Sequence, residues 1–103
     1  MNDTEFDCVV VGGGVFGLAT GLELARRGRR TAVVDRLGSG HPATSSTGLS
    51  RSIRIAYDQP LYVTLAREAL GSWRRIEADT GRTILHLTGQ IDLGPQAKMQ
   101  SIF

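Results

Sequence analysis

Three glycines, Gly12, Gly14 and Gly17, have the spacing G-x-G-x-x-G in the stretch VVVGGGVFG of residues 9–17. The first glycine permits a tight turn, the second lets a phosphate approach the backbone, and the third lets a following helix pack close to the preceding strand. The N–H groups and positive dipole end at the start of that helix favour bound negative charge. We therefore expect a phosphate-binding turn made of Gly12, Gly13, Gly14, Val15, Phe16 and Gly17.

An acidic residue, Asp35, lies 18 positions after Gly17. A carboxylate at about this distance from the motif accepts a hydrogen bond from a ribose 2′-hydroxyl, which indicates FAD or NAD rather than NADP. Arg36 argues the other way, because a neighbouring arginine could serve a 2′-phosphate. A glycine-rich turn without any ligand is the alternative that the motif alone leaves open.

The elements that must position these residues follow from the surrounding pattern. Residues 8–11, CVVV, predict a strand that is covered on both faces. A helix should follow, because Val15, Leu18, Leu22 and Ala25 line one face, and Gly28 suits a left-handed residue after its last turn. Residues 31–34 predict a second strand that ends at Asp35. Together these elements make a strand–turn–helix–strand unit around the glycine motif.

The next segment, LGSGHPATSSTGLSR at residues 37–51, is rich in small and hydroxyl side chains. It is either a flexible linker or a loop whose hydroxyls and N–H groups surround the phosphate and ribityl parts of a cofactor. Arg51 and Arg54 then lie three positions apart, which places them together on a helical turn but on opposite faces of a strand.

A long helix is expected over residues 60–80, with Pro60 in its first turn, Asp58 as its cap and Gly81 at its end. Its apolar stripe is expected to lie in a core. Two short strands at 83–87 and 90–93 should form a hairpin through Thr88 and Gly89. His41 and His86 have no partners in sequence that would make a metal site, so no metal is expected.

Composition excludes several other classes. The 103 residues carry a net charge of +2, and no arginine run is longer than two, so a nucleic-acid surface is not indicated. The longest apolar run has four residues, against the roughly 20 that cross a bilayer, so no membrane partner is expected. The acidic, polar start and the single cysteine, Cys8, fit a cytoplasmic protein.

The stretch VVVGGGVFGLATGLELARRGRRTAVVDR, followed by SSTGLSRSIRIAY, resembles the N-terminus of the D-amino-acid-oxidase-like FAD-dependent oxidoreductases. It is most similar to their monomeric sarcosine oxidase and N-methyl amino acid oxidase branch. The R-x-x-R-x-A-Y element is particular to this branch. Residues 88–95 match a second pattern of the branch, T-G-x-x-x-x-G-P.

The resemblance implies roles for individual residues. It assigns the motif glycines and Asp35 to the ADP part of FAD, and Ser46, Ser50 and Arg51 to the loop beside the flavin. It places Arg51 near the flavin ring and assigns Arg54 to the substrate carboxylate. Those oxidases often carry two histidines before the loop glycine, where this chain has Ser46 and Thr47. The resemblance therefore does not single out sarcosine as substrate.

Members of this family are several times longer than this chain. The expected fold is α/β, the N-terminal portion of a Rossmann-like FAD-binding fold, and residues 1–103 are expected to be an incomplete part of that domain. The parent enzyme would oxidise an amine or amino acid, with dioxygen as second substrate and hydrogen peroxide as product. An NAD-binding dehydrogenase domain and a non-catalytic nucleotide-binding subunit that needs a partner chain are the alternatives.

Overall fold

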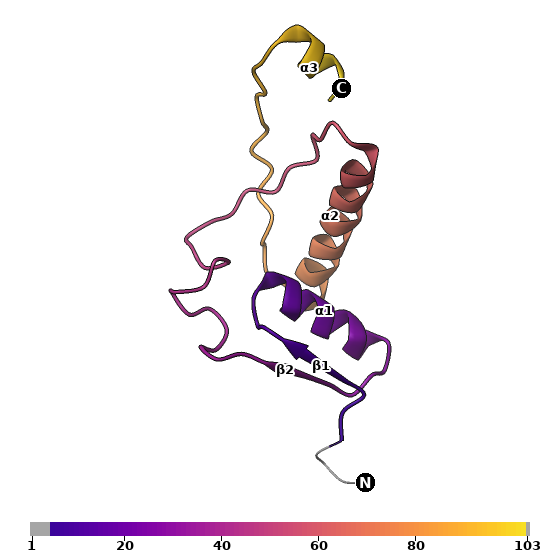
Figure 1. Ribbon diagram of the computed structural model, residues 1–103, viewed down its shortest axis with the longest axis vertical. Helices are drawn as coiled ribbons and strands as arrows, with labels where there is room; N and C mark the ends of the chain where they lie inside the picture. Colours follow the sequence, from indigo (N-terminus) through magenta and orange to yellow (C-terminus); the bar gives the residue numbers. More distant parts are fainter. Residues whose placement is uncertain (1–4, 103) are drawn as a thin grey trace. The chain divides into compact units, whose positions relative to one another are not determined.

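The computed structural model describes residues 5–102, which divide into two compact units between Arg51 and Ser52. The first unit contains β1 (Cys8–Val11), α1 (Val15–Arg26) and β2 (Thr31–Val34), and the second contains α2 (Pro60–Thr80) and α3 (Gln96–Gln100) (Figure 1). The element order confirms the α/β class and the strand–helix–strand start. The short helix α3 has no counterpart among the predictions.

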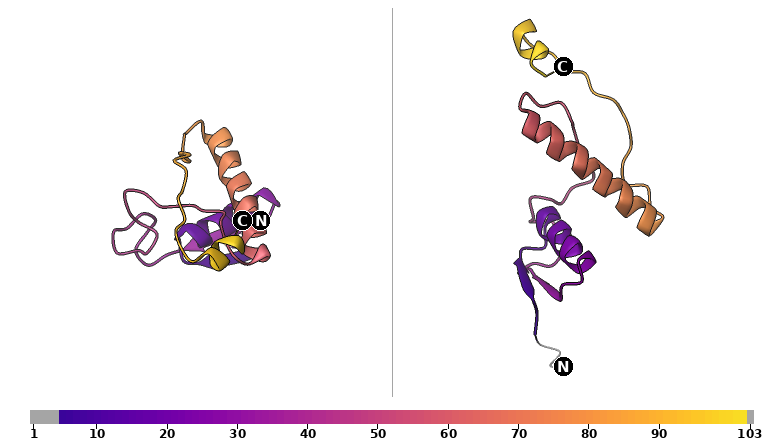
Figure 2. Two further views of the ribbon diagram at one scale, coloured as in Figure 1. Left: turned by 90° about the horizontal axis from the view of Figure 1, so that it is seen from above. Right: turned by 90° about the vertical axis from the view of Figure 1, so that its right-hand side faces the viewer.

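The two strands pair in parallel, with Cys8 opposite Thr31 and Val11 opposite Val34. Parallel strands need a crossover connection, and α1 supplies it by lying against one face of the pair (Figures 1 and 2). Gly28 follows the last turn of α1 with φ +72°, as predicted for a residue that ends a helix in the left-handed region.

Glycines, not the apolar stripe, form the face of α1 that meets the sheet. Gly21 is buried, and a Cβ added there would come 2.7 Å from Cγ2 of Val33. The predicted stripe lies on a different face of the helix, where Val15, Leu18 and Leu22 are each about 40% exposed. The close approach of helix and sheet therefore depends on the absence of side chains at the contact.

Within the described residues of the first unit, the other face of the two-stranded sheet has no cover. Val9 is 59% exposed and Val11 87% exposed, so the prediction that this strand is covered on both faces is wrong for this chain. Apart from Gly13 and Gly21, no residue in the described range is fully buried. A parallel sheet normally has both faces covered, so this unit presents apolar surface that other residues would have to cover.

Helix α2 begins and ends near the predicted positions. Pro60 occupies its first turn, and Gly81 follows its last residue with φ +66°. The predicted cap is wrong, because Gln59 holds the N-cap position and makes no side-chain cap hydrogen bond. The expected core is not formed either, since Leu61 and Leu65 are 64% and 50% exposed and α2 has no buried residue. Within the described part of the chain, no helix is both long and apolar enough to cross a membrane.

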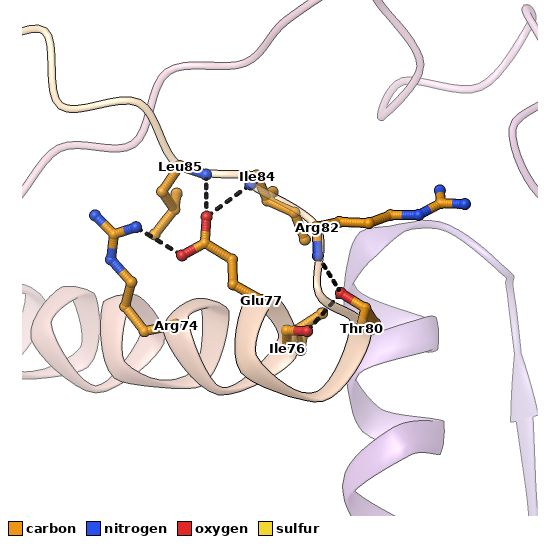
Figure 3. Close-up of polar contacts among 7 residues, drawn as sticks. All are labelled: Arg74, Ile76, Glu77, Thr80, Arg82, Ile84 and Leu85. Carbon is orange, nitrogen blue, oxygen red and sulfur yellow. Dashed lines mark hydrogen bonds and ion pairs between the residues drawn. The ribbon is translucent and has the colours of Figure 1, made fainter.

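The predicted hairpin is absent, since residues 83–93 contain no strand. The N–H groups of Ile84 and Leu85 donate instead to Oε1 of Glu77, at 2.6 and 2.7 Å, and Arg74 donates to Oε2 at 2.6 Å (Figure 3). An isolated two-stranded hairpin is marginal in water, and here two of its backbone donors are held by the carboxylate of α2. Glu77 thus fixes the path of the chain where it leaves the helix.

Candidate dinucleotide-binding site

The glycine turn lies between the end of β1 and the start of α1. The N–H of Gly12 donates to the carbonyl of Val34 at 2.8 Å, and Gly12 has φ +107°, a conformation that favours glycine. A Cβ on Gly17 would collide with the carbonyl oxygen of Gly12 and lie 2.9 Å from its carbon. The turn can therefore close tightly only because Gly12 and Gly17 are glycines.

The N-terminus of α1 is suited to an anion. Gly14 holds the N-cap position and has no side chain to cap the first turn. The first N–H groups of a helix lack intrahelical partners and carry the positive end of its dipole. Asp and Glu are absent from the first turn of α1, so no fixed charge of the helix itself opposes a phosphate there.

Asp35 follows β2 directly and reaches back to the turn. Its Oδ2 accepts the N–H of Gly13 at 2.7 Å, and its Oδ1 accepts the N–H of Leu37 at 2.8 Å. The Gly13 bond, then the Leu37 bond, hold the pKa of Asp35 below its usual value, and the charge of Arg36 adds the smallest contribution. Asp35 is therefore ionised at neutral pH, and its carboxylate keeps lone pairs that can accept ribose hydroxyls.

The polar loop also approaches the turn. Oγ of Ser46 accepts the N–H of Val15 at 3.4 Å, although 31 positions separate the two residues, and a Cβ on Gly14 would lie 3.3 Å from the same oxygen. A hydroxyl from the loop thus stands at the helix N-terminus. This contact makes the loop part of the candidate site, which favours the cofactor loop over the flexible linker.

Arg51 holds the polar loop from within. Its guanidinium donates to the carbonyls of Ser50, at 2.9 Å, Ser45, at 3.0 Å, and Thr47. Ser50 takes part through its backbone carbonyl. These contacts give Arg51 a role in shaping the loop that the sequence did not suggest.

Arg51 is the last residue of the first unit, and Arg54 belongs to the second unit. Its guanidinium carbon lies 4.9 Å from the centre of the Tyr57 ring. Tyr57 was not predicted as a site residue, although its place three positions after an arginine is a signal that could have drawn attention to it. In the described residues, no group of three or more His, Cys, Asp or Glu side chains is arranged to hold a metal.

The residues at the turn fit a dinucleotide. A helix N-terminus whose N-cap residue is Gly14, and an ionised carboxylate after the second strand, meet the needs of a pyrophosphate and a ribose. This geometry alone does not distinguish FAD from NAD.

Comparison with known proteins decides between the two cofactors. The family described as FAD dependent oxidoreductase (DAO) matches residues 7–102. A probable sarcosine oxidase of Arabidopsis thaliana is 35% identical over 101 residues, which cover 98% of this chain and 24% of that protein. Monomeric sarcosine oxidase of Bacillus sp. (strain B-0618) is 38% identical over 96 residues, 92% of this chain and 25% of that protein.

N-methyl-L-tryptophan oxidase of Yersinia pestis (strain Pestoides F) is 33% identical over 92 residues, which cover 88% of this chain and 25% of that protein. The chain thus spans about a quarter of the length of these curated relatives. The family match covers both described units and carries FAD as its cofactor, which sets aside the NAD alternative. The chain therefore belongs to the DAO family of FAD-dependent oxidoreductases.

Proposed function

We propose that this chain is the N-terminal part of the FAD-binding domain of an oxidase that acts on amino acids or N-methyl amino acids. The observation that carries the proposal is the carboxylate of Asp35 bonded to the N–H of Gly13, in the turn that leads into α1. Support for the substrate class comes from the family match and from relatives named as sarcosine and N-methyl-L-tryptophan oxidases.

In this proposal the first unit holds the ADP half of FAD. The N–H groups of the glycine turn and the dipole of α1 bind the pyrophosphate, and Asp35 accepts hydrogen bonds from the ribose. Ser46, Ser50 and Arg51 belong to the loop beside the flavin, where the contacts of Arg51 with loop carbonyls keep the loop in shape. Arg36 flanks the ribose site, and Val15 and Phe16 contribute backbone from the first turn of the helix.

Arg54 would orient the substrate. A guanidinium can hold a carboxylate through two parallel hydrogen bonds, which fixes both the position and the direction of an amino acid. When bound, FAD supplies the redox chemistry, taking a hydride equivalent from the carbon beside the amine and passing the electrons to dioxygen, which becomes hydrogen peroxide. The residues of this chain bind and orient, and the remaining walls of the site come from the rest of the enzyme.

The test begins with the coding DNA beyond the codon for Phe103. An open reading frame that continues the family pattern supports the proposal, and the protein it encodes should copurify with FAD and release peroxide on addition of N-methyl amino acids. A stop codon at that point, together with a stable complex between this chain and another protein, would favour the non-catalytic subunit instead.

A further inference from the structure

The two arginines of the R-x-x-R element use their donors differently. Arg51 donates to three backbone carbonyls of its own loop. Arg54 has no hydrogen-bonding or ion-pair partner among the described residues, and its guanidinium carbon lies over the Tyr57 ring, 4.9 Å from the ring centre. The N–H donors of Arg54 therefore stay available for a ligand, whereas those of Arg51 are engaged.

The Tyr57 ring is itself supported. Its centre lies 6.0 Å from that of the Tyr62 ring, with the two rings inclined by 46°. Tyr62 lies in the first turn of α2, where its N–H donates to the carbonyl of Gln59 at 3.0 Å. Aromatic pairs at this separation attract one another, so a helix end braces the ring that contacts Arg54.

We propose that Tyr57 is a positioning residue for Arg54, its ring face holding the guanidinium while the N–H donors remain free to bind the carboxylate of an amino-acid substrate. An arginine within about 6 Å of a ring centre is attracted by the negative face of the ring. That attraction limits the rotamers of a long, exposed side chain before substrate arrives, which reduces the entropy lost on binding. The inference rests on the carboxylate-binding role proposed above for Arg54.

The experiment uses the longer enzyme with bound FAD and four variants, Tyr57→Leu, Tyr57→Phe, Arg54→Met and the double variant Tyr57→Leu/Arg54→Met. Two ligands are compared, an N-methyl amino acid and the amine of the same structure without its carboxylate. KM is measured for both, and the dissociation constant of a non-oxidisable carboxylic-acid analogue is measured from the change it causes in the flavin spectrum. Flavin content and thermal melting check that each variant is folded.

We expect Tyr57→Leu to weaken binding of the acid by about 2- to 5-fold, the range that a cation–π contact at an exposed site provides. The amine should be affected less than twofold. Tyr57→Phe keeps the ring and should retain most of the native affinity for the acid. In the Arg54→Met background, Tyr57→Leu should have no further effect, because the pair acts as a unit.

Three results would overturn the inference while leaving the proposed role of Arg54 standing: equal losses for acid and amine in Tyr57→Leu, a loss in Tyr57→Phe as large as in Tyr57→Leu, or an undiminished effect of Tyr57→Leu in the Arg54→Met background. A different result bears on the proposed function. If Arg54→Met leaves the preference for the acid over the amine unchanged, Arg54 does not bind the carboxylate, and the role of Tyr57 fails with it.

Tyr62→Leu, which removes a ring that contacts Tyr57 but not Arg54, is the matched control and should have the smaller effect.

Discussion

The carboxylate of Asp35 accepts the N–H of Gly13 at 2.7 Å, across 22 positions of the sequence. This bond joins the end of β2 to the glycine turn after β1, so one side chain both shapes the turn and offers an ionised acceptor beside it. A Cβ on Gly13 would lie 3.2 Å from Cβ of Asp35, which shows how closely the two meet. Asp35, the proposed ribose acceptor, thus also supports the turn that is proposed to bind phosphate.

Asp35→Ala in the longer enzyme should weaken FAD binding by about 10- to 150-fold, the range expected when a hydrogen bond to a charged group is lost. The variant loses both the proposed ribose acceptor and the contact with the N–H of Gly13 that holds the turn. The measurement is a fluorescence titration of apoprotein with FAD. An unchanged affinity would remove Asp35 from the site.

Asp7 offers a matched control for this variant. Its Oδ2 accepts the N–H of Arg30 at 2.8 Å, a carboxylate-to-backbone bond across 23 positions at the opposite end of the same two strands. Asp7→Ala should lower stability without changing the affinity for FAD. Equal losses of affinity in the two variants would mean that Asp35 acts through the fold alone.

Gly17→Ala should be more damaging than any other single-methyl addition in the first unit. The added Cβ would meet the backbone carbonyl of Gly12, which cannot move without opening the turn, whereas at Gly21 it meets only a methyl group of Val33. We expect Gly17→Ala to cost at least the roughly 1–3 kcal/mol typical of overpacking, measured as a shift in the urea unfolding midpoint, and to lower flavin content.

The control for that variant is Gly71→Ala, in the middle of α2. An added Cβ there meets no atom within 4 Å, so the change should be neutral or stabilise by up to about 1 kcal/mol through helix propensity. A Gly17→Ala protein as stable as Gly71→Ala would contradict the tight turn described here.

Local patterns predicted β1, α1, β2 and α2, together with the ends at Gly28 and Gly81, because those features depend on neighbours a few residues away. The spacing of the motif also predicted Asp35 as a ribose acceptor, but it did not predict the hydrogen bond between Asp35 and the N–H of Gly13. The errors have another origin. The buried stripe of α2 depends on partners distant in sequence. The hairpin at 83–93 depends on near neighbours, and the carboxylate of Glu77 accepts two of the backbone donors that it would have used. Tyr57 was not predicted, although it lies three positions after Arg54 in the R-x-x-R-x-A-Y element, because spacing alone does not show that its ring meets the guanidinium.

The contacts of Glu77 predict an acid-sensitive helix end. The N–H of Leu85, then the guanidinium of Arg74, then the N–H of Ile84 lower the pKa of Glu77 from its usual 4.5 to about 2. A carboxyl group whose pKa falls on folding stabilises the folded state fully above its unfolded pKa, and that contribution is lost as pH falls through the folded pKa. The window is therefore about pH 4.5 down to about 2.

In that window the amide signals of Ile84 and Leu85 should shift together in NMR spectra, with a midpoint near pH 2. Glu77→Gln should abolish the shift, because the glutamine side chain does not titrate. Glu68→Gln, on the same helix, should leave the midpoint unchanged. Amide signals that titrate with the same midpoint in Glu77→Gln would assign the transition to another group.

Residues 1–103 alone should form neither a stable flavoprotein nor an oxidase. Val11 is 87% exposed, Leu61 64% exposed, and only Gly13 and Gly21 are fully buried among residues 5–102. So little burial cannot offset a backbone ordering cost of about 1–2 kcal/mol per residue. FAD stabilises a fold only in proportion to its affinity, and a site without its remaining walls should bind it weakly.

We therefore expect no cooperative melt by far-UV circular dichroism with excess FAD, and no peroxide from a panel of N-methyl amino acids, while the longer enzyme gives both under the same conditions. Tight stoichiometric flavin with a cooperative melt would instead make the chain an autonomous domain. Amine-dependent peroxide above background would mean that Arg51 and Arg54 suffice without the rest of the site.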